Sequence, residues 1–158
     1  MATINSTSFS GDTLEIIAFR LHEQEFCVKT TTIREIRGWA PSTPIPHAPA
    51  DVIGVMNLRG SVIPIIDLAY KLGMQSTVAN ERSAIVVAEV HNMVIGMLVD
   101  RVSDILTIAS SQVQPVPEVT ASFDRAYCEG IIATENGMIC FLNLAKMFKE
   151  SEAEELAA

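Results

Sequence analysis

The stretch IIAFRLH at residues 16–22 recurs as IVVAEVH at residues 85–91, at a constant offset of 69 positions. Each copy is a short run of apolar residues that ends at a histidine, and runs of this length bounded by polar residues are typical of buried β-strands. The recurrence of the same pattern in both halves of the chain predicts an internal duplication.

The repeat continues in the same order downstream. At the offset of 69, Ile33, Glu35 and Ile36 correspond to Val102, Asp104 and Ile105, and at an offset of 76, GV at 54–55 and IIDLA at 65–69 correspond to GI at 130–131 and FLNLA at 141–145. The seven additional residues fall in the connecting segment of the second half. Each half therefore contains a hairpin, a strand of the pattern apolar-x-acid-Ile, and a second hairpin.

Most of the chain alternates with period two or forms short apolar runs, so we expect a mainly β protein. Five strands per half suggest two small barrels, because closure of a sheet removes its exposed edges. The ten predicted strands are 14–22, 25–29, 33–38, 52–58, 61–67, 83–90, 93–99, 102–107, 129–134 and 137–142.

Short helices and loops are predicted between these strands. Asp67 and Asn143 are placed to cap a helical turn at the end of each repeat, and Gly73 can end the first of these turns. Residues 41–49 contain four prolines, which favours an extended crossover over a central strand. The loop at 110–125 is expected to contain a turn of helix near Gln112.

Composition restricts the kinds of partner. The 158 residues are 49% apolar and carry a net charge of −8, which disfavours nucleic acid or anionic lipid as the main ligand and favours a protein. No apolar stretch is long enough to cross a bilayer, and residues 1–12 lack the pattern of a signal peptide. Cys27, Cys128 and Cys140 are predicted to be reduced thiols packed in apolar surroundings.

A search for catalytic motifs finds no convincing set of residues. His22 and His91 occupy equivalent positions of the repeat, so duplication explains them better than a metal pair, and no glycine pattern of a nucleotide site is present. Asp67, Asp100 and Glu35 are the acids that a small β-barrel enzyme could use. This alternative requires partner groups that the sequence does not show.

The segment GVMNLRG at residues 54–60 is unusual because Asn57 and Arg59 interrupt an apolar strand. One interpretation is a hairpin turn in which Gly60 takes a positive φ and Arg59 is solvated. The other gives Arg59 a partner, and Glu35 is the best candidate because it could accept two guanidinium hydrogen bonds. Such a pair is expected to be half-buried and to hold two strands together.

Four motifs resemble the CheW family: EIRG at 35–38, NLRG at 57–60, VIPIIDL at 62–68 and LVDRV at 98–102. The resemblance extends from about Thr13 to Phe148. It implies a CheW-like domain at 13–149, built as two intertwined five-stranded SH3-like β-barrel subdomains with short helices, with repeats at about 14–73 and 83–149. Residues 1–12 and 150–158 are expected to be a flexible and an acidic tail.

The resemblance implies a non-enzymatic, cytoplasmic chemotaxis adaptor without cofactor or metal, which couples chemoreceptor cytoplasmic tips to the histidine kinase CheA in membrane-associated arrays. It also implies a stand-alone adaptor, monomeric in isolation, rather than a fragment of CheV or CheA. No motif identifies the kinase-binding residues. The receptor-binding positions carried over from the family are Ile33, Glu35, Gly54, Asn57, Arg59 and Gly60. A chemosensory pathway that controls pili or a second messenger would use the same fold.

Overall fold

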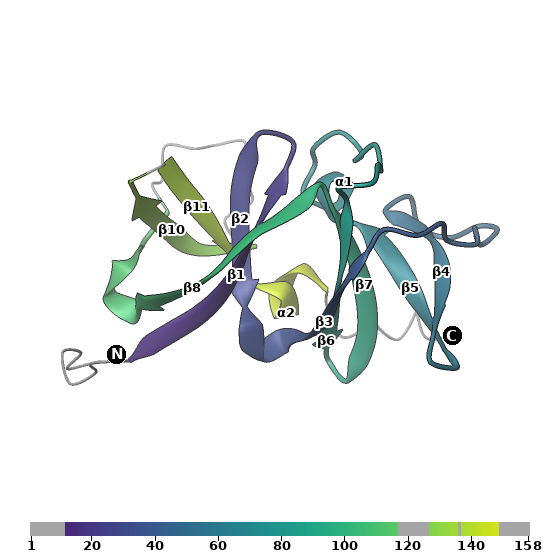
Figure 1. Ribbon diagram of the computed structural model, residues 1–158, viewed down its shortest axis with the longest axis horizontal. Helices are drawn as coiled ribbons and strands as arrows, with labels where there is room; N and C mark the ends of the chain where they lie inside the picture. The colour runs from purple at the N-terminus through teal and green to yellow at the C-terminus, as the bar shows by residue number, and fades with distance from the viewer. Residues whose placement is uncertain (1–11, 117–126, 136, 149–158) are drawn as a thin grey trace.

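The computed structural model describes residues 12–116, 127–135 and 137–148, which form two sheets side by side (Figure 1). The first half contributes β1 (Thr13–Leu21), β2 (Gln24–Lys29), β3 (Ile33–Gly38), β4 (Val52–Leu58), β5 (Ser61–Asp67) and α1 (Leu68–Lys71). The second half contributes β6 (Ala84–Val90), β7 (Met93–Val99), β8 (Arg101–Ala109), β9 (Val113–Gln114), β10 (Cys128–Thr134), β11 (Gly137–Leu142) and α2 (Leu144–Met147). The mainly β prediction and the duplication are confirmed.

The two halves exchange strands, so neither sheet belongs to one repeat. One sheet has the order β8-β1-β2-β11-β10-β9 and the other has the order β3-β6-β7-β5-β4. The first hairpin of each half therefore shares a sheet with the remaining strands of the other half, which are β8 to β11 for β1–β2 and β3 to β5 for β6–β7. The pairings are equivalent in the two sheets, because β8 is antiparallel to β1 as β3 is to β6, and β11 is parallel to β2 as β5 is to β7.

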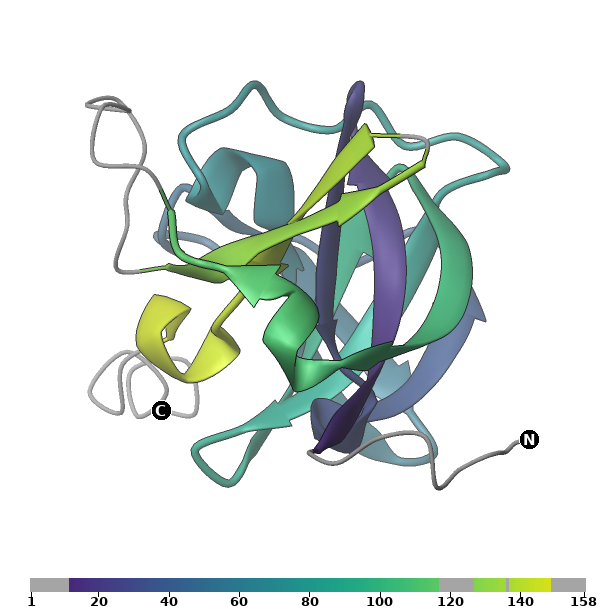
Figure 2. The ribbon, with the colours of Figure 1, turned by 90° about the vertical axis from the view of Figure 1, so that its left-hand side faces the viewer.

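The chain itself joins the outer strands of each sheet. In the first sheet, a 3-10 turn at Ser110–Gln112 leads from β8 to β9 at the opposite edge, which is seen in Figure 2. In the second sheet, the proline-rich crossover leaves β3 and forms an isolated bridge from Thr43 to Val55 of β4. Both connections cover an edge that would otherwise present unpaired backbone groups.

Glycine is required where each connection meets the sheet. A Cβ atom on Gly54 would lie 2.4 Å from the Thr43 carbonyl oxygen, and one on Gly130 would lie 2.6 Å from the Gln114 carbonyl oxygen. Both glycines follow a β-bulge at the same position of the repeat. The matching glycines of the sequence repeat therefore mark two sites where a neighbouring backbone leaves no room for a side chain.

The apolar side chains form three clusters. The largest lies between the sheets and takes Phe19 and Phe26 from one hairpin together with Val86 and Met97 from the other. A smaller cluster fills the inside of each sheet, around Ile16 and Phe141 in one and around Ile85 and Ile65 in the other. The alternating strands thus bury both faces, one within a sheet and one between the sheets.

The two short helices have the predicted caps. The Asp67 carboxylate accepts hydrogen bonds from the amides of Tyr70 and Thr77, each at 3.2 Å, and the Asn143 side chain accepts one from the Lys146 amide at 3.1 Å. Gly73 follows α1 with a φ of 83°. These side chains satisfy helix-end amides that would otherwise lack a partner.

The paired histidines are structural. His22 and His91 both occupy hairpin turns with positive φ, and their Nε2 atoms lie 2.7 Å from the Gln75 carbonyl oxygen and 2.9 Å from the Ala145 carbonyl oxygen. Each histidine thus joins a turn of one sheet to the segment around the short helix at the end of the other. Duplication accounts for both, as the sequence suggests.

Other predictions have mixed outcomes. The 3-10 turn near Gln112 is confirmed, but treating the whole 110–125 segment as a loop is wrong, because Val113–Gln114 pairs with β10. A two-residue strand is too short to show a period. All three cysteines are buried free thiols. The predicted tails at 1–12 and 150–158 lie outside the described residues, apart from Asp12.

We predict that Gly54→Ala destabilises the protein by about 1 to 3 kcal/mol, because the added methyl group overlaps fixed backbone of the crossover. Gly38→Ala is the matched control, since a Cβ atom there meets no atom within 4 Å. Urea unfolding followed by fluorescence measures both. Equal stability of the two variants would show that the crossover moves aside at little cost.

Candidate partner-binding site

The turn between β4 and β5 is a tight two-residue hairpin loop. Arg59 and Gly60 both have positive φ, 52° and 88°, while Leu58 pairs with Ser61. The Asn57 side-chain oxygen accepts a hydrogen bond from the Gly60 amide at 2.9 Å. These are the features of a type I′ turn, whose positive φ angles glycine adopts readily and arginine rarely. The interpretation of Gly60 as a turn residue is confirmed.

Arg59 is also paired with Glu35, as the second interpretation predicts. Both guanidinium Nη atoms donate to the two carboxylate oxygens, Nη2 to Oε1 at 3.3 Å, and Arg37 adds a second cation 3.4 Å from Oε1. Glu35 is on β3 and Arg59 follows β4, so the pair joins the two outer strands of the sheet. The Arg59 side chain is 72% exposed and that of Glu35 is 22% exposed. The expectation of a half-buried pair is therefore wrong for its cation.

The ion pair changes the titration of its carboxylate. The hydrogen bond from Arg59 lowers the pKa of Glu35 below its ordinary value of 4.5, and Arg37 acts in the same direction. Glu35 in turn raises the pKa of Arg59. Because the folded pKa of Glu35 is lowered, the pair stabilises the fold above the ordinary pKa and loses this contribution as the pH falls through the lowered value. The pair is complete at neutral pH.

Apolar side chains are exposed beside this charged pair. Val62, which faces Asn57 across the hairpin, is 66% exposed, and Ile36, next to Glu35, is 39% exposed. Trp39 and Ile53 are exposed farther along the same outer strands and the crossover. A polar centre with apolar neighbours on a surface is a common composition for a protein-binding site.

The structure brings four of the six predicted receptor-binding residues together: Glu35, Asn57, Arg59 and Gly60. Ile33 lies at the start of β3, separated from Glu35 by a bulge, and packs against the core between the sheets. Gly54 is buried under the crossover, so its packing function explains it without a partner. Val62 is exposed on β5, where the alternating pattern places its side chain on the face opposite the buried Ile63.

The second repeat carries a different pair of charges at the positions equivalent to Glu35 and Arg59. Asp104 corresponds to Glu35 at the offset of 69, and Glu135 corresponds to Arg59 at the offset of 76. Both line one surface depression of the first sheet, together with Arg20, Glu25 and Met138. Two carboxylates replace the ion pair there. Among the described residues, Asp104 and Glu135 form no salt bridge, and β8 and β10 still pair with β1 and β11 as β3 and β4 pair with β6 and β5.

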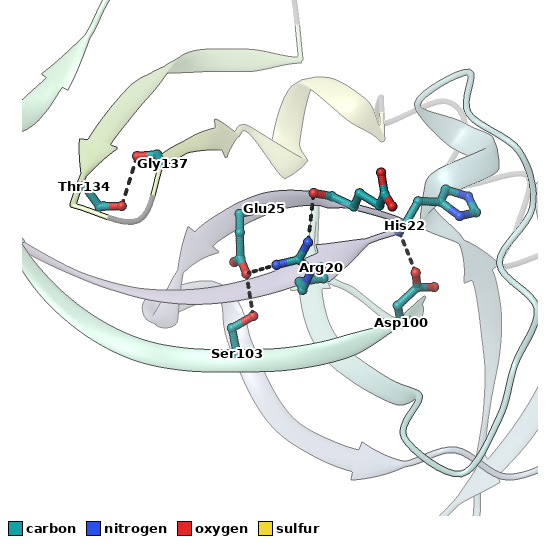
Figure 3. Close-up of polar contacts among 8 residues, drawn as sticks. Arg20, His22, Glu25, Asp100, Ser103, Thr134 and Gly137 are labelled. Carbon is teal, nitrogen blue, oxygen red and sulfur yellow. Dashed lines mark hydrogen bonds and ion pairs between the residues drawn. The ribbon is translucent and has the colours of Figure 1, made fainter.

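Polar contacts near that depression join three strands of the first sheet (Figure 3). The Glu25 carboxylate of β2 accepts hydrogen bonds from Arg20 of β1 at 3.5 Å and from Ser103 of β8 at 2.9 Å. The Arg20 guanidinium also donates to the Glu23 carbonyl oxygen at 2.9 Å. Sequence reasoning missed this network, because nothing in the sequence places β8 next to β1.

The acids considered for an enzyme have structural partners. Asp67 caps α1, and the Asp100 carboxylate accepts a hydrogen bond from the backbone amide of His22, which fixes the β1–β2 turn (Figure 3). Glu35 is neutralised by Arg59. Within 12–116, 127–135 and 137–148, no three His, Cys, Asp or Glu side chains converge as a metal site would require. In the same part of the chain, no helix has the length and apolar character needed to cross a membrane.

We predict that Arg59→Ala raises the pKa of Glu35 toward 4.5, because the largest cause of the lowered value is removed. Arg37→Ala should raise it less, since its hydrogen bond is the weaker of the two. Titration of the Glu35 side-chain carboxyl by NMR, with unfolding midpoints at pH 7 as the folding control, measures both. An unchanged pKa in Arg59→Ala would show that the pair does not form in solution.

Comparison with known proteins places this geometry in one family. The family model described as a CheW-like domain matches residues 15–152. The chemotaxis protein CheW of Rhizobium meliloti (strain 1021) is 49% identical over 140 residues, which cover 89% of this chain and 90% of that protein. A probable chemotaxis protein CheW of Rhizobium etli is 50% identical with the same coverage.

A solved structure agrees with these relatives. The crystal structure of the scaffolding protein TtCheW from Thermoanaerobacter tengcongensis superposes with a TM-score of 0.80 at 30% identity, covering 89% of this chain and 96% of that one. The resemblance that the four sequence motifs indicate is thereby confirmed over nearly the whole domain. The chain belongs to the CheW family of non-enzymatic chemotaxis scaffold proteins.

Proposed function

We propose that this protein couples the cytoplasmic tips of chemoreceptors to the histidine kinase CheA in signalling arrays. Family membership supports the two partners, and the net charge of −8 supports protein rather than nucleic acid as the ligand. The protein works in the cytoplasm and reaches the membrane through the receptor. It is a monomer in isolation, which is supported by the covered edges of both sheets.

The observation that carries the proposal is the exposed Arg59–Glu35 pair with its apolar neighbours. A receptor tip is a helical hairpin in the family, and a helix binds a sheet surface through apolar anchors while polar groups set its register. Val62 on β5 and Ile36 on β3 supply exposed apolar area on the strands next to the pair. Arg59, held by Glu35, presents the remaining guanidinium hydrogens to an acceptor on the helix.

The duplication acts as an internal control for this assignment. If the salt bridge were needed to hold the strands of the second sheet together, the first sheet would need one too. It carries Asp104 and Glu135 at the equivalent positions and still forms the same pairings. The charge arrangement around Arg59 is therefore better explained by binding than by folding.

The receptor surface comprises Glu35, Asn57, Arg59 and Gly60 at its centre, Ile33 at one side, and Gly54 beneath it. Asn57 and Gly60 hold the turn that presents Arg59, and Gly54 allows the crossover to pack against β4. Their contributions to binding are thus partly indirect. The kinase contact lies elsewhere on the protein, so that receptor and kinase can bind together.

We predict that Arg59→Ala weakens recruitment to receptor-containing membranes by roughly fivefold or more, because the charge-assisted hydrogen bond from Arg59 to the receptor helix is lost. The measurement is co-sedimentation of the purified protein and its cognate kinase with receptor-containing membranes, over a range of protein concentrations. Wild-type protein should carry the kinase into the pellet.

Arg101→Ala is the matched control, because Arg101 is an exposed arginine on β8 of the other sheet. It should sediment like the wild type, and Arg59→Ala should keep its binding to soluble kinase. Equal loss in both variants would show a general effect of charge instead of a receptor site at Arg59. Failure of the wild type to sediment with either partner would contradict the coupling function itself.

A further inference from the structure

Two cysteine sulfurs lie close together in the first sheet. Cys128 begins β10 and Cys140 is in β11, and their Sγ atoms are 2.9 Å apart. Both side chains belong to the apolar cluster between the sheets and are less than a tenth exposed. The Cys128 thiol also donates to the Gly130 carbonyl oxygen at 3.1 Å, which directs its sulfur. The two thiols therefore need only a small movement to reach bonding distance.

A β-bulge is the reason for this proximity. Ile131 pairs with Cys140 and Gly130 with Phe141, yet Cys128 pairs with Leu142, so one residue of β10 is left out of the register. The bulge brings Cys128 one position nearer to Cys140 than a regular ladder would. It depends on Gly130, where the close approach of Gln114 leaves no room for a side chain.

We propose that Cys128 and Cys140 are an oxidative modification site that forms an intramolecular disulfide with peroxide as the oxidant. The pairing crosslinks two adjacent strands of one sheet without a second protein molecule. It is independent of the receptor surface, because these cysteines belong to the other sheet. Neither the chemotaxis scaffold function nor the ion pair at Arg59 requires it.

The two thiols differ in reactivity. The hydrogen bond from Cys140 lowers the pKa of Cys128 to about 7, whereas the same contact and burial raise the pKa of Cys140. Cys128 is therefore partly thiolate at neutral pH and is the sulfur that first attacks a peroxide oxygen. Burial raises the pKa of Cys27 to about 12, so Cys27 stays a thiol.

The reaction balances with peroxide alone. The Cys128 thiolate takes one peroxide oxygen and becomes sulfenic acid, and the hydroxide released combines with the proton that Cys128 lost to give water. The Cys140 sulfur then attacks the Cys128 sulfur, and the sulfenic oxygen leaves as a second water with the Cys140 proton. The pair loses two protons and two electrons, and the peroxide is reduced to two waters.

The test is oxidation of the folded, fully reduced full-length protein with hydrogen peroxide, followed by denaturation, alkylation of free thiols and peptide mass spectrometry. We expect one disulfide joining the peptides of Cys128 and Cys140, with Cys27 alkylated. Its rate should not change with protein concentration. Amide hydrogen exchange in the β10–β11 hairpin should slow in the oxidised protein, because the crosslink restrains its opening.

Cys27→Ala is the matched control and should form the same disulfide at the wild-type rate. Cys140→Ser keeps a hydrogen-bond donor beside Cys128 and should instead give a Cys128 sulfenic acid that a dimedone probe traps, which keeps the test valid without the crosslink. Three alkylated thiols after peroxide treatment would overturn the proposal. A disulfide that contains Cys27, or one that forms only between molecules, would overturn it as well.

Discussion

The exchange of strands between the two halves is the constraint on which the structure depends. The β1–β8 and β3–β6 pairings bind each hairpin to strands of the other repeat, so neither sheet can form from one half alone. The large apolar cluster between the sheets follows from this arrangement, because both hairpins turn one face toward it. Burial of apolar surface then stabilises the sheets and their mutual orientation together. Both sheets therefore combine strands of the two repeats.

Duplication also explains how one framework carries different surfaces. Backbone features recur in both halves: the bulge and glycine under each crossing segment, the capping oxygen after each last strand, and the histidine in each first turn. Exposed side chains do not contribute to these backbone features, so they can differ between the two halves. Arg59 and Glu35 meet on one sheet, while the equivalent positions of the other carry two acids. A scaffold that binds two different partners needs such divergence on a shared backbone.

The candidate site could be predicted in part. Arg59 and Asn57 stand out in the sequence because charge and amide interrupt an apolar strand, and a carboxylate in β3 is the natural partner. The exposure of Arg59 could not be predicted, since it depends on where the turn lies relative to the neighbouring strands. Val62 was missed because an isolated exposed valine in an apolar run carries no sequence signal. Gly54 was assigned to binding, while its close contact with Thr43 shows a packing function.

Ten of the eleven described strands, their buried faces, the helix caps and the family could be predicted from the sequence, because each depends on local pattern or on ordered motifs. Only the tertiary structure decided which strands are neighbours, and with them the Arg20–Glu25–Ser103 network, the Arg59–Glu35 contact and the approach of Cys128 to Cys140. The physical reason is that backbone hydrogen bonds are the same for every strand, so a period of two specifies a face and leaves the partner open. Which strands become neighbours is decided by the packing of the whole chain.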